Sequence, residues 1–305
     1  MPMLGIMASQ ISGHLGNPNT WTTKTAMTTA RSFNTATTVG ANVYVIGGED
    51  SGGNALTTNE QYSTSGNSWS SKTAMTAGRT FPSAAAVSTV IYVMGGGDGS
   101  NYGTTSNYAY DTVANTWSTK ATVTTAKGLA TASAVSTVIY FISGTNATGD
   151  VQTTNYAYDT VANTWSTKTA LTTGRYNLTR AAVSTVIYVM GGTTGGTNRL
   201  STNEAYDTVA NTWSTKTAVT VTLSSAAAAA SGTVIYVTGG SSPTGSPADI
   251  NTNYAYDTVG NSWSTKAAMP AAKRNFGAAA YNGKIYAIGG VLSAAVSATN
   301  YQYEI

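Results

Sequence analysis

The stretch that decides the fold reads Tyr-Asp-Thr-Val-Ala-Asn-Thr-Trp-Ser-Thr-Lys at residues 110–120. It recurs without a change at residues 158–168 and 206–216, and related copies occupy residues 62–72 and 256–266. The tryptophans keep the same interval, with successive separations of 48, 48, 48, 48 and 50 residues, at Trp21, Trp69, Trp117, Trp165, Trp213 and Trp263. A fixed period of this length predicts stacked or radial repeats. We therefore expect the 305 residues to form one cooperative body.

Each unit contains four short runs of β-branched, aromatic or small residues that are separated by turn residues. In one complete unit these runs are residues 83–87, 90–94, 107–110 and 116–118. They have no helical period, which indicates β-strands, here called A to D in chain order. Four antiparallel strands in a radial repeat describe one blade of a β-propeller. The small Ala and Ser residues of strand A fit the crowded position next to the axis.

Three recurrent features have structural explanations. A Gly pair follows strand B in most units, where it permits positive φ and close backbone approach, and the third unit has Ser143-Gly144 there. Each Trp is expected to fill the wedge between blades, with its indole N–H on a backbone acceptor. A recurrent Asp is expected to close the tight turn after strand C, at Asp111, Asp159, Asp207 and Asp257.

The succession Ile-Tyr-Val, Gly-Gly, Tyr-Asp, Asn-x-Trp and then Met with a basic residue resembles the kelch repeat. The resemblance extends from Trp21 to Tyr303 and implies an all-β, six-bladed propeller, which we place at residues 18–305. Five units have all four strands, whereas strands A to C of the sixth, within residues 276–304, have no following Trp strand. The missing strand is expected at residues 19–24, so that the N-terminal strand closes the last blade and no open sheet edge is left.

Composition excludes several classes of function. Charged residues make up 9% of the chain with a net charge of +3, and no basic run suggests a nucleic-acid partner. Without cysteine the chain has no disulfides, zinc–thiolate sites or thiol chemistry, which fits a bacterial or phage cytoplasmic origin. No apolar run approaches the roughly 20 residues of a membrane helix, so we expect a soluble protein with no membrane insertion. A surface rich in Thr, Ser and Asn is common in extracellular and virion β proteins.

Residues 1–17 lie outside the repeat and contain no Lys or Arg, unlike a secretory signal. Their apolar side chains suggest a tail that docks on a partner or on the propeller itself, through Leu4, Ile6, Met7, Ile11 and Leu15. Residues 4–13 resemble the opening of tail-associated structural proteins of tailed bacteriophages. This resemblance implies a protein made in the bacterial cytoplasm and located in the virion, where the tail contacts other virion proteins within a larger assembly.

The two faces of the expected ring differ in their variability. The A–B and C–D turns share one face and are nearly constant, whereas the B–C and D–A loops share the other face, and the B–C loops vary from unit to unit. Divergence between otherwise copied units suggests that the variable face recognises something, although loops also drift because they tolerate change. The B–C residues that we select as candidates for ligand or partner binding are Asp50, Asp98, Tyr102, Asp150 and Arg199.

The D–A loops place basic and aromatic residues at equivalent positions. The candidates are Arg31, Phe33, Arg79, Phe81, Lys127, Arg175, Tyr176, Arg274 and Phe276, with Lys273 beside Arg274, while the fifth unit has Leu223 at the basic position. The kelch resemblance implies that this region lines the mouth of the central channel and binds ligands. Guanidinium groups beside aromatic faces suit carboxylates, acidic peptides or sugars. We favour the alternative that these basic side chains span neighbouring blades and bond to loop carbonyls, because a basic residue at this position is part of the general kelch pattern.

The sequence provides little catalytic equipment. Kelch-type galactose oxidases use copper with His, Tyr and a Tyr–Cys crosslink, but this chain has one histidine, His14, and no cysteine. Residues 98–101 could ligate a cation, but we favour a solvated turn. We find no phosphate loop, no Ser–His–Asp set and no acid–base pair, and we expect a non-enzymatic protein without cofactor or metal.

The leading hypothesis is a bacteriophage virion protein, associated with the tail or a fibre, whose propeller contacts host surface glycan or protein, or a neighbouring virion protein. One alternative is a carbohydrate-acting kelch enzyme such as a sialic-acid mutarotase, and another is a cellular interaction adaptor. Recent duplication and consensus construction would both leave units that are this similar.

Overall fold

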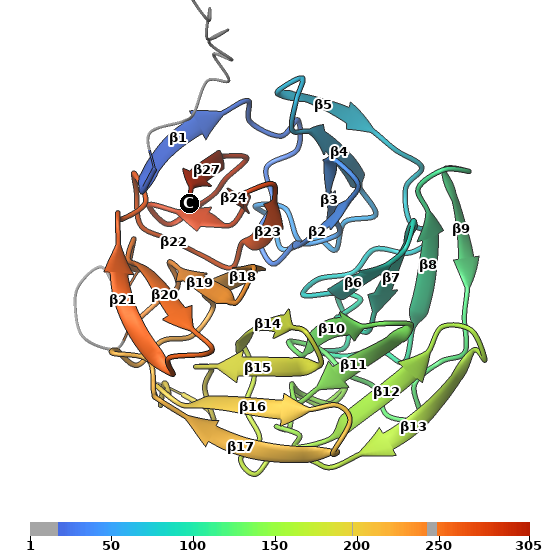
Figure 1. Ribbon diagram of the computed structural model, residues 1–305. Coiled ribbons are helices and arrows are strands. Elements are labelled where there is room, and N and C mark those ends of the chain that lie inside the picture. The colour runs from blue at the N-terminus through green and yellow to red at the C-terminus, as the bar shows by residue number, and fades with distance from the viewer. Residues whose placement is uncertain (1–17, 197, 243–248) are drawn as a thin grey trace, which may run out of the picture.

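The computed structural model describes residues 18–196, 198–242 and 249–305. The described residues form strands and turns, without helices. Six four-stranded antiparallel sheets are arranged around a central axis, as Figure 1 shows, so the expected six-bladed all-β propeller is confirmed.

Strand A of each blade lies next to the axis and strand B follows it outward. The A strands are β2 (Thr35–Val39), β6 (Ser83–Val87), β10 (Thr131–Val135), β14 (Thr179–Val183), β18 (Ala227–Ser231) and β23 (Gly277–Tyr281). The B strands are β3 (Asn42–Ile46), β7 (Val90–Met94), β11 (Val138–Ile142), β15 (Val186–Met190), β19 (Val234–Thr238) and β24 (Lys284–Ile288). The small residues of the A strands let neighbouring sheets approach closely at the centre.

Strands C and D complete each blade toward the rim. The C strands are β4 (Asn59–Ser63), β8 (Asn107–Asp111), β12 (Asn155–Asp159), β16 (Asn203–Asp207), β20 (Asn253–Asp257) and β27 (Asn300–Glu304). The D strands are β5 (Ser68–Ser71), β9 (Thr116–Thr119), β13 (Thr164–Lys168), β17 (Thr212–Lys216), β21 (Ser262–Lys266) and β1 (Thr20–Lys24). A small additional sheet, which the sequence did not predict, joins β22 (Lys273–Arg274), β25 (Val291–Leu292) and β26 (Ala295–Val296).

The sixth blade is built from both ends of the chain, as expected. Strand β1 pairs antiparallel with β27 in a register that places Trp21 opposite Tyr303. The backbone N–H of Asn19 also donates to the carbonyl of Glu304 at 2.8 Å. Closure therefore pairs residues that are 276 to 284 positions apart in the chain, and no described blade lacks a strand.

The hydrophobic core is divided into six clusters, each of which lies between two neighbouring blades. The strand C tyrosines fill these wedges, with Tyr62, Tyr110, Tyr158, Tyr206, Tyr256 and Tyr303 all at most 1% exposed. Each Trp is half-buried and packs against the edge of one of these clusters, which confirms its expected place in the wedge between blades. Each stacks at a tilt on its blade's tyrosine, as Trp165 does on Tyr158 at 5.0 Å between ring centroids.

A repeated hydrogen-bonded contact, which we call the clasp, joins each blade to the one before it. Between the second and third blades, the indole N–H of Trp165 donates to the carbonyl of Ala121 at 2.7 Å. The N–H of Ala121 donates to the side-chain oxygen of Asn163 at 2.9 Å, and the same oxygen accepts the hydroxyl of Tyr158 at 2.6 Å. Equivalent clasps occur at every interface, and the one that closes the ring consists of Ala267, Asn19, Trp21 and Tyr303.

Candidate functional site

Four of the predicted basic residues are buried and cannot contact a ligand at the mouth of the channel. Arg31, Lys127, Arg175 and Lys273 are all 0% exposed. Each lies under the loops of its own blade, where strands B and C separate. Lys127, for example, donates to the carbonyls of Ser143 at 2.9 Å and Thr154 at 2.8 Å. The selection of these four residues as ligand-binding cations is therefore wrong, and the favoured alternative, bonding to loop carbonyls, is confirmed, although the bonds lie within one blade.

The two buried arginines are also paired with carboxylates on strand C. Arg31 forms an ion pair with Glu60 and bonds to Thr58, while Arg175 pairs with Glu204 at 2.6 Å. These pairs neutralise charge inside the blades, where an unpaired guanidinium would be costly. In the fifth blade Leu223 occupies the same position and is equally buried, so the position does not require a charge.

The buried lysines have no carboxylate partner, and their environment changes their titration. Burial lowers the pKa of both Lys127 and Lys273 to about 7, because desolvation penalises the ammonium form. Carbonyl oxygens and aromatic faces surround each amine, and the Nζ of Lys273 lies 5.0 Å from the ring centroid of Phe276. Phe276 is itself buried, so both residues have structural roles.

The other predicted basic residues lie nearer the surface but are partly engaged. Arg79 is 8% exposed and donates to Ser106, Gly78 and Tyr108. Arg274 forms an ion pair with Asp249 at 2.5 Å. Arg199 is half-buried and donates to Ser224 at 3.1 Å. None of them completes a ring of cations around the channel.

The mouth of the channel on the variable face is a narrow ring of six equivalent residues, all with left-handed φ between 47° and 58°. They are Phe33, Phe81, Leu129, Asn177, Ser225 and Asn275, and they line a space of about 110 Å³. Backbone hydrogen bonds join consecutive members at four of the six steps, but not on either side of Phe81. Phe33 and Phe81 meet edge to face at 4.9 Å. Positive φ in bulky residues is strained, and such strain is concentrated at functional sites.

Tyr176, in the loop before Asn177, is half-buried.

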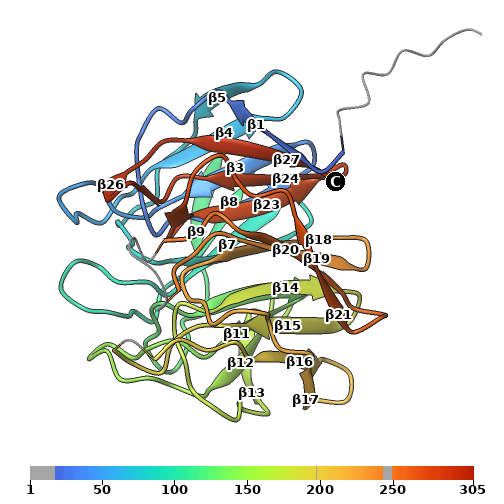
Figure 2. The ribbon, with the colours of Figure 1, turned by 90° about the vertical axis from the view of Figure 1, so that its left-hand side faces the viewer.

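A groove of about 290 Å³ lies beside this ring, between the B–C loops of the first two blades. Two predicted aromatic residues line it, Phe81 and Tyr102, and Tyr102 is 56% exposed. Its polar wall comprises Glu49, Thr80, Ser100 and Asn101. Burial raises the pKa of the Glu49 carboxyl, while a hydrogen bond from Ser32 opposes this shift. These loops project on the side of the disc opposite the C-terminus, on the left in Figure 2.

The predicted acidic loop residues brace their own loops. The Asp98 carboxylate accepts the backbone N–H groups of Ser100 at 3.0 Å and Asn101 at 2.8 Å, and these bonds hold its pKa below the usual range. Asp50 accepts bonds from Asn54 and Gly52 in the same way, and Asp150 accepts the hydroxyl of Thr148. Within the described ranges, no cluster of three acidic or histidine side chains could hold a metal ion.

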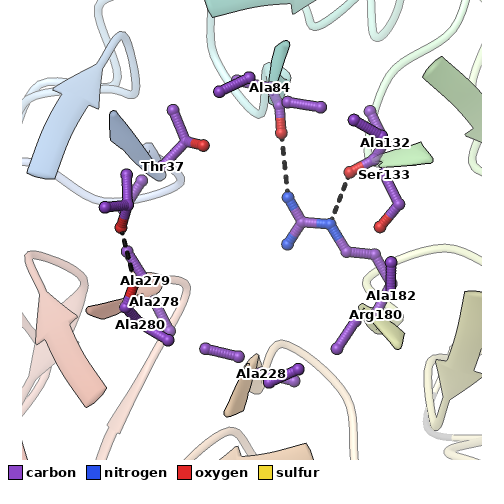
Figure 3. Close-up of a pocket in the computed structure, with 18 residues that line it drawn as sticks. Thr37, Ala84, Ala132, Ser133, Arg180, Ala182, Ala228, Ala278, Ala279 and Ala280 are labelled. Atoms are coloured by element: carbon purple, nitrogen blue, oxygen red, sulfur yellow. Dashed lines mark hydrogen bonds between the residues drawn. The ribbon is translucent and has the colours of Figure 1, made fainter. Parts of the chain in front are cut away.

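The central channel contains a residue that the sequence analysis missed. Strand A residues line a cavity of about 290 Å³, and its wall consists of alanines with Thr37, Thr38, Ser133 and Arg180. Figure 3 shows the Arg180 side chain extending from one wall into the channel, with hydrogen bonds to Ala132 and Ala84. Aligning the six A strands would have identified it, because every other unit has Ala at that position.

The predicted docking tail, residues 1–17, lies outside the described residues, as does His14. In the part of the chain that the structure describes, no helix is long and apolar enough to cross a membrane.

The fold and its repeats define the class of protein. The family model of the Attractin/LZTR1 β-propeller matches residues 43–300, so the chain belongs to this β-propeller family. A solved structure of the protein YjhT superposes with a TM-score of 0.79 at 14% identity, covering 90% of this chain and 95% of that one. A search of the curated proteins gives no significant match. In total 821 solved chains match significantly, so the likeness establishes the fold, which many proteins share.

Proposed function

We propose that this protein is a binding propeller without catalytic activity and that it recognises carbohydrate in the groove between the first and second blades. The observation that carries the proposal is the exposed aromatic ring of Tyr102 beside Phe81, in a cavity otherwise walled by hydroxyl, amide and carboxyl groups. Sugars present apolar C–H faces and many hydroxyls. An aromatic platform with adjacent donors and acceptors matches both properties.

The loops that carry these groups are braced before any ligand arrives. Asp98 fixes the loop from residue 98 to residue 101 through two backbone bonds, and Asp50 does the same in the neighbouring blade. The N–H of Tyr102 also donates to the carbonyl of Ala147 in the third blade at 3.2 Å. A loop that is already ordered loses little conformational entropy on binding, which favours affinity for a flexible glycan.

A carbohydrate-acting enzyme would need a general acid and a general base close to one another. Among the described residues that line the channel, Arg180 is the sole titratable side chain. In the groove, Glu49 is the sole acidic residue of the described wall and has no acidic partner there. These surroundings support binding over catalysis. The virion location and the docking role of the tail stay predictions, because they rest on residues 1–17.

The proposal is tested by screening the purified protein on a glycan array and measuring the affinity for the best-retained glycan by titration calorimetry. We expect Tyr102→Ala to weaken this affinity about tenfold, since losing one aromatic contact costs on the order of 1 kcal/mol. Tyr176→Ala is the matched control, because Tyr176 lies on the same face but outside the groove. Retention of no glycan, or equal weakening by both variants, would refute the groove as the site.

A further inference from the structure

Arg180 interrupts an otherwise uniform wall of small side chains. At the second position of strand A the blades have Ala36, Ala84, Ala132, Ala228 and Ala278, and only the fourth blade has an arginine there. Strand β14 keeps the register of its counterparts, with Arg180 opposite Val189 just as Ala132 lies opposite Phe141. The fold itself therefore does not require an arginine at this position, since alanine satisfies it in five blades.

The guanidinium reaches across two blades but uses only part of its hydrogen-bonding capacity. Its Nε donates to the carbonyl of Ala132 at 2.7 Å, and its Nη2 donates to the carbonyl of Ala84 at 3.1 Å. A guanidinium has five N–H donors, so these two bonds leave three without a partner among the described residues. In Figure 3 the edge formed by the two terminal nitrogens faces the open centre of the channel.

The surroundings of this edge favour an anion. The described residues that line the cavity include no carboxylate, so nothing on the wall neutralises the guanidinium. Burial lowers the pKa of Arg180 to about 10, which still leaves the group charged at neutral pH. Thr37 lies on the part of the wall that the two terminal nitrogens face, and its hydroxyl bonds to no other described residue, whereas Ser133 lies beside the aliphatic part of Arg180. Together these groups offer several donors and one uncompensated positive charge in a confined space.

We propose that the central channel holds a binding site for a small carboxylate, with Arg180 as its anchor and the hydroxyl of Thr37, on the facing wall, as a further donor. The two terminal nitrogens of a guanidinium present parallel N–H bonds that match the two oxygens of a carboxylate. The cavity of about 290 Å³ has room for such a molecule. This site is separate from the groove, which Phe81 and Tyr102 line.

The test uses acetate as the probe, titrated into the full chain in a chloride buffer of constant ionic strength. Carbon-13 relaxation of labelled acetate reports binding, and a crystal grown in acetate reports its position. We expect saturable binding with density on the terminal nitrogens of Arg180, weakened about tenfold or more in Arg180→Ala, since both charge-assisted bonds are lost. Arg180→Lys is expected to bind acetate more tightly than Arg180→Ala but less tightly than the parent, because lysine keeps the charge but lacks the two parallel N–H donors.

Two controls distinguish a binding site from a role of Arg180 that is limited to linking neighbouring blades. Arg180→Ala has the residue that the other blades contain, and its melting temperature without acetate shows whether it folds. If the guanidinium only ties three blades together, the variant loses the same stability with and without acetate, and the parent binds no acetate saturably. That result would overturn the proposal. Binding that is equal in parent and variant, or chloride competition as strong as acetate itself, would also overturn it.

Discussion

The clasp makes a quantitative prediction about what holds neighbouring blades together. In the third blade, Asn163 has a φ of 56°, and its side-chain oxygen accepts both the Tyr158 hydroxyl and the Ala121 N–H. The change Asn163→Gly keeps this backbone conformation accessible but removes the acceptor. Burial raises the pKa of Tyr158 to about 12, so its hydroxyl remains a donor at any ordinary pH.

The expected cost follows from the contacts that are lost. Two hydrogen bonds contribute about 1 kcal/mol each, and leaving the buried Tyr158 hydroxyl unsatisfied adds roughly 1–2 kcal/mol. Asn163→Gly should therefore lower the free energy of unfolding by about 3–4 kcal/mol. Tyr158→Phe removes only the hydroxyl and should cost about 1 kcal/mol. The double variant loses the same two hydrogen bonds but leaves no hydroxyl orphaned, so it should cost about 2 kcal/mol, which is about 2–3 kcal/mol less than the sum of the two single costs.

The assay is equilibrium unfolding in urea, with the denaturant slope compared among variants to confirm a common transition. Asn177→Gly is the control for the glycine itself, because Asn177 has a φ of 53° and makes only backbone hydrogen bonds. Its cost is subtracted from that of Asn163→Gly. A coupling energy below about 0.5 kcal/mol would refute the clasp and leave Asn163 as a simple turn residue.

Three further predictions concern closure, titration and the groove. Deleting residues 1–25 removes β1 and should abolish cooperative unfolding, and a truncated chain that melts like the parent would contradict ring closure. For the buried lysines, the unfolded chain binds protons that the folded chain lacks between pH 7 and the ordinary pKa of 10.5, so stability should fall as the pH is lowered from 10 to 7. Lys127 and Lys273 are each replaced with leucine, the residue of the fifth blade, and the free energy of unfolding in urea is measured at several pH values. The variant should show a weaker dependence on pH. If the dependence is unchanged, it arises from other groups. Gly128→Ala would place a methyl group 1.7 Å from the Tyr102 carbonyl oxygen, so it should displace the loop that carries Tyr102 and weaken glycan binding. An unaltered affinity in calorimetry would argue against the groove as the glycan site.

The repeats made the architecture predictable from the sequence. The interval between tryptophans and the four runs per unit correctly predicted the six blades, their strands and the closing strand at residues 20–24. The turn role of Asp111 is also confirmed, because its carboxylate accepts the N–H groups of Val113 and Ala114. These features depend on residues that are close in sequence or on the repeat period, and both can be recognised in one sequence.

Side-chain direction and contacts between blades were not predictable in the same way. The spacing located Arg31 and Lys127 on the correct loops, but it could not show that these side chains turn inward to the carbonyls of Thr58 and Thr154, just before strand C. The partner of Asn163 is 42 residues earlier in the chain and becomes a neighbour only when the ring forms. Likewise, Phe81 and Tyr102 were candidates on separate loops, and only the structure brings them into one groove.

The closing clasp has a consequence for where the polypeptide can begin. Ala267 contacts Asn19 and Trp21 with the same geometry that Ala121 uses for Asn163 and Trp165, so the junction between the termini is chemically equivalent to the others. A circular permutant that joined residue 305 to residue 18 and opened the chain between any two other sheets would regenerate all six junctions. A permutant that begins one repeat later in the sequence should therefore fold to the same six-bladed propeller.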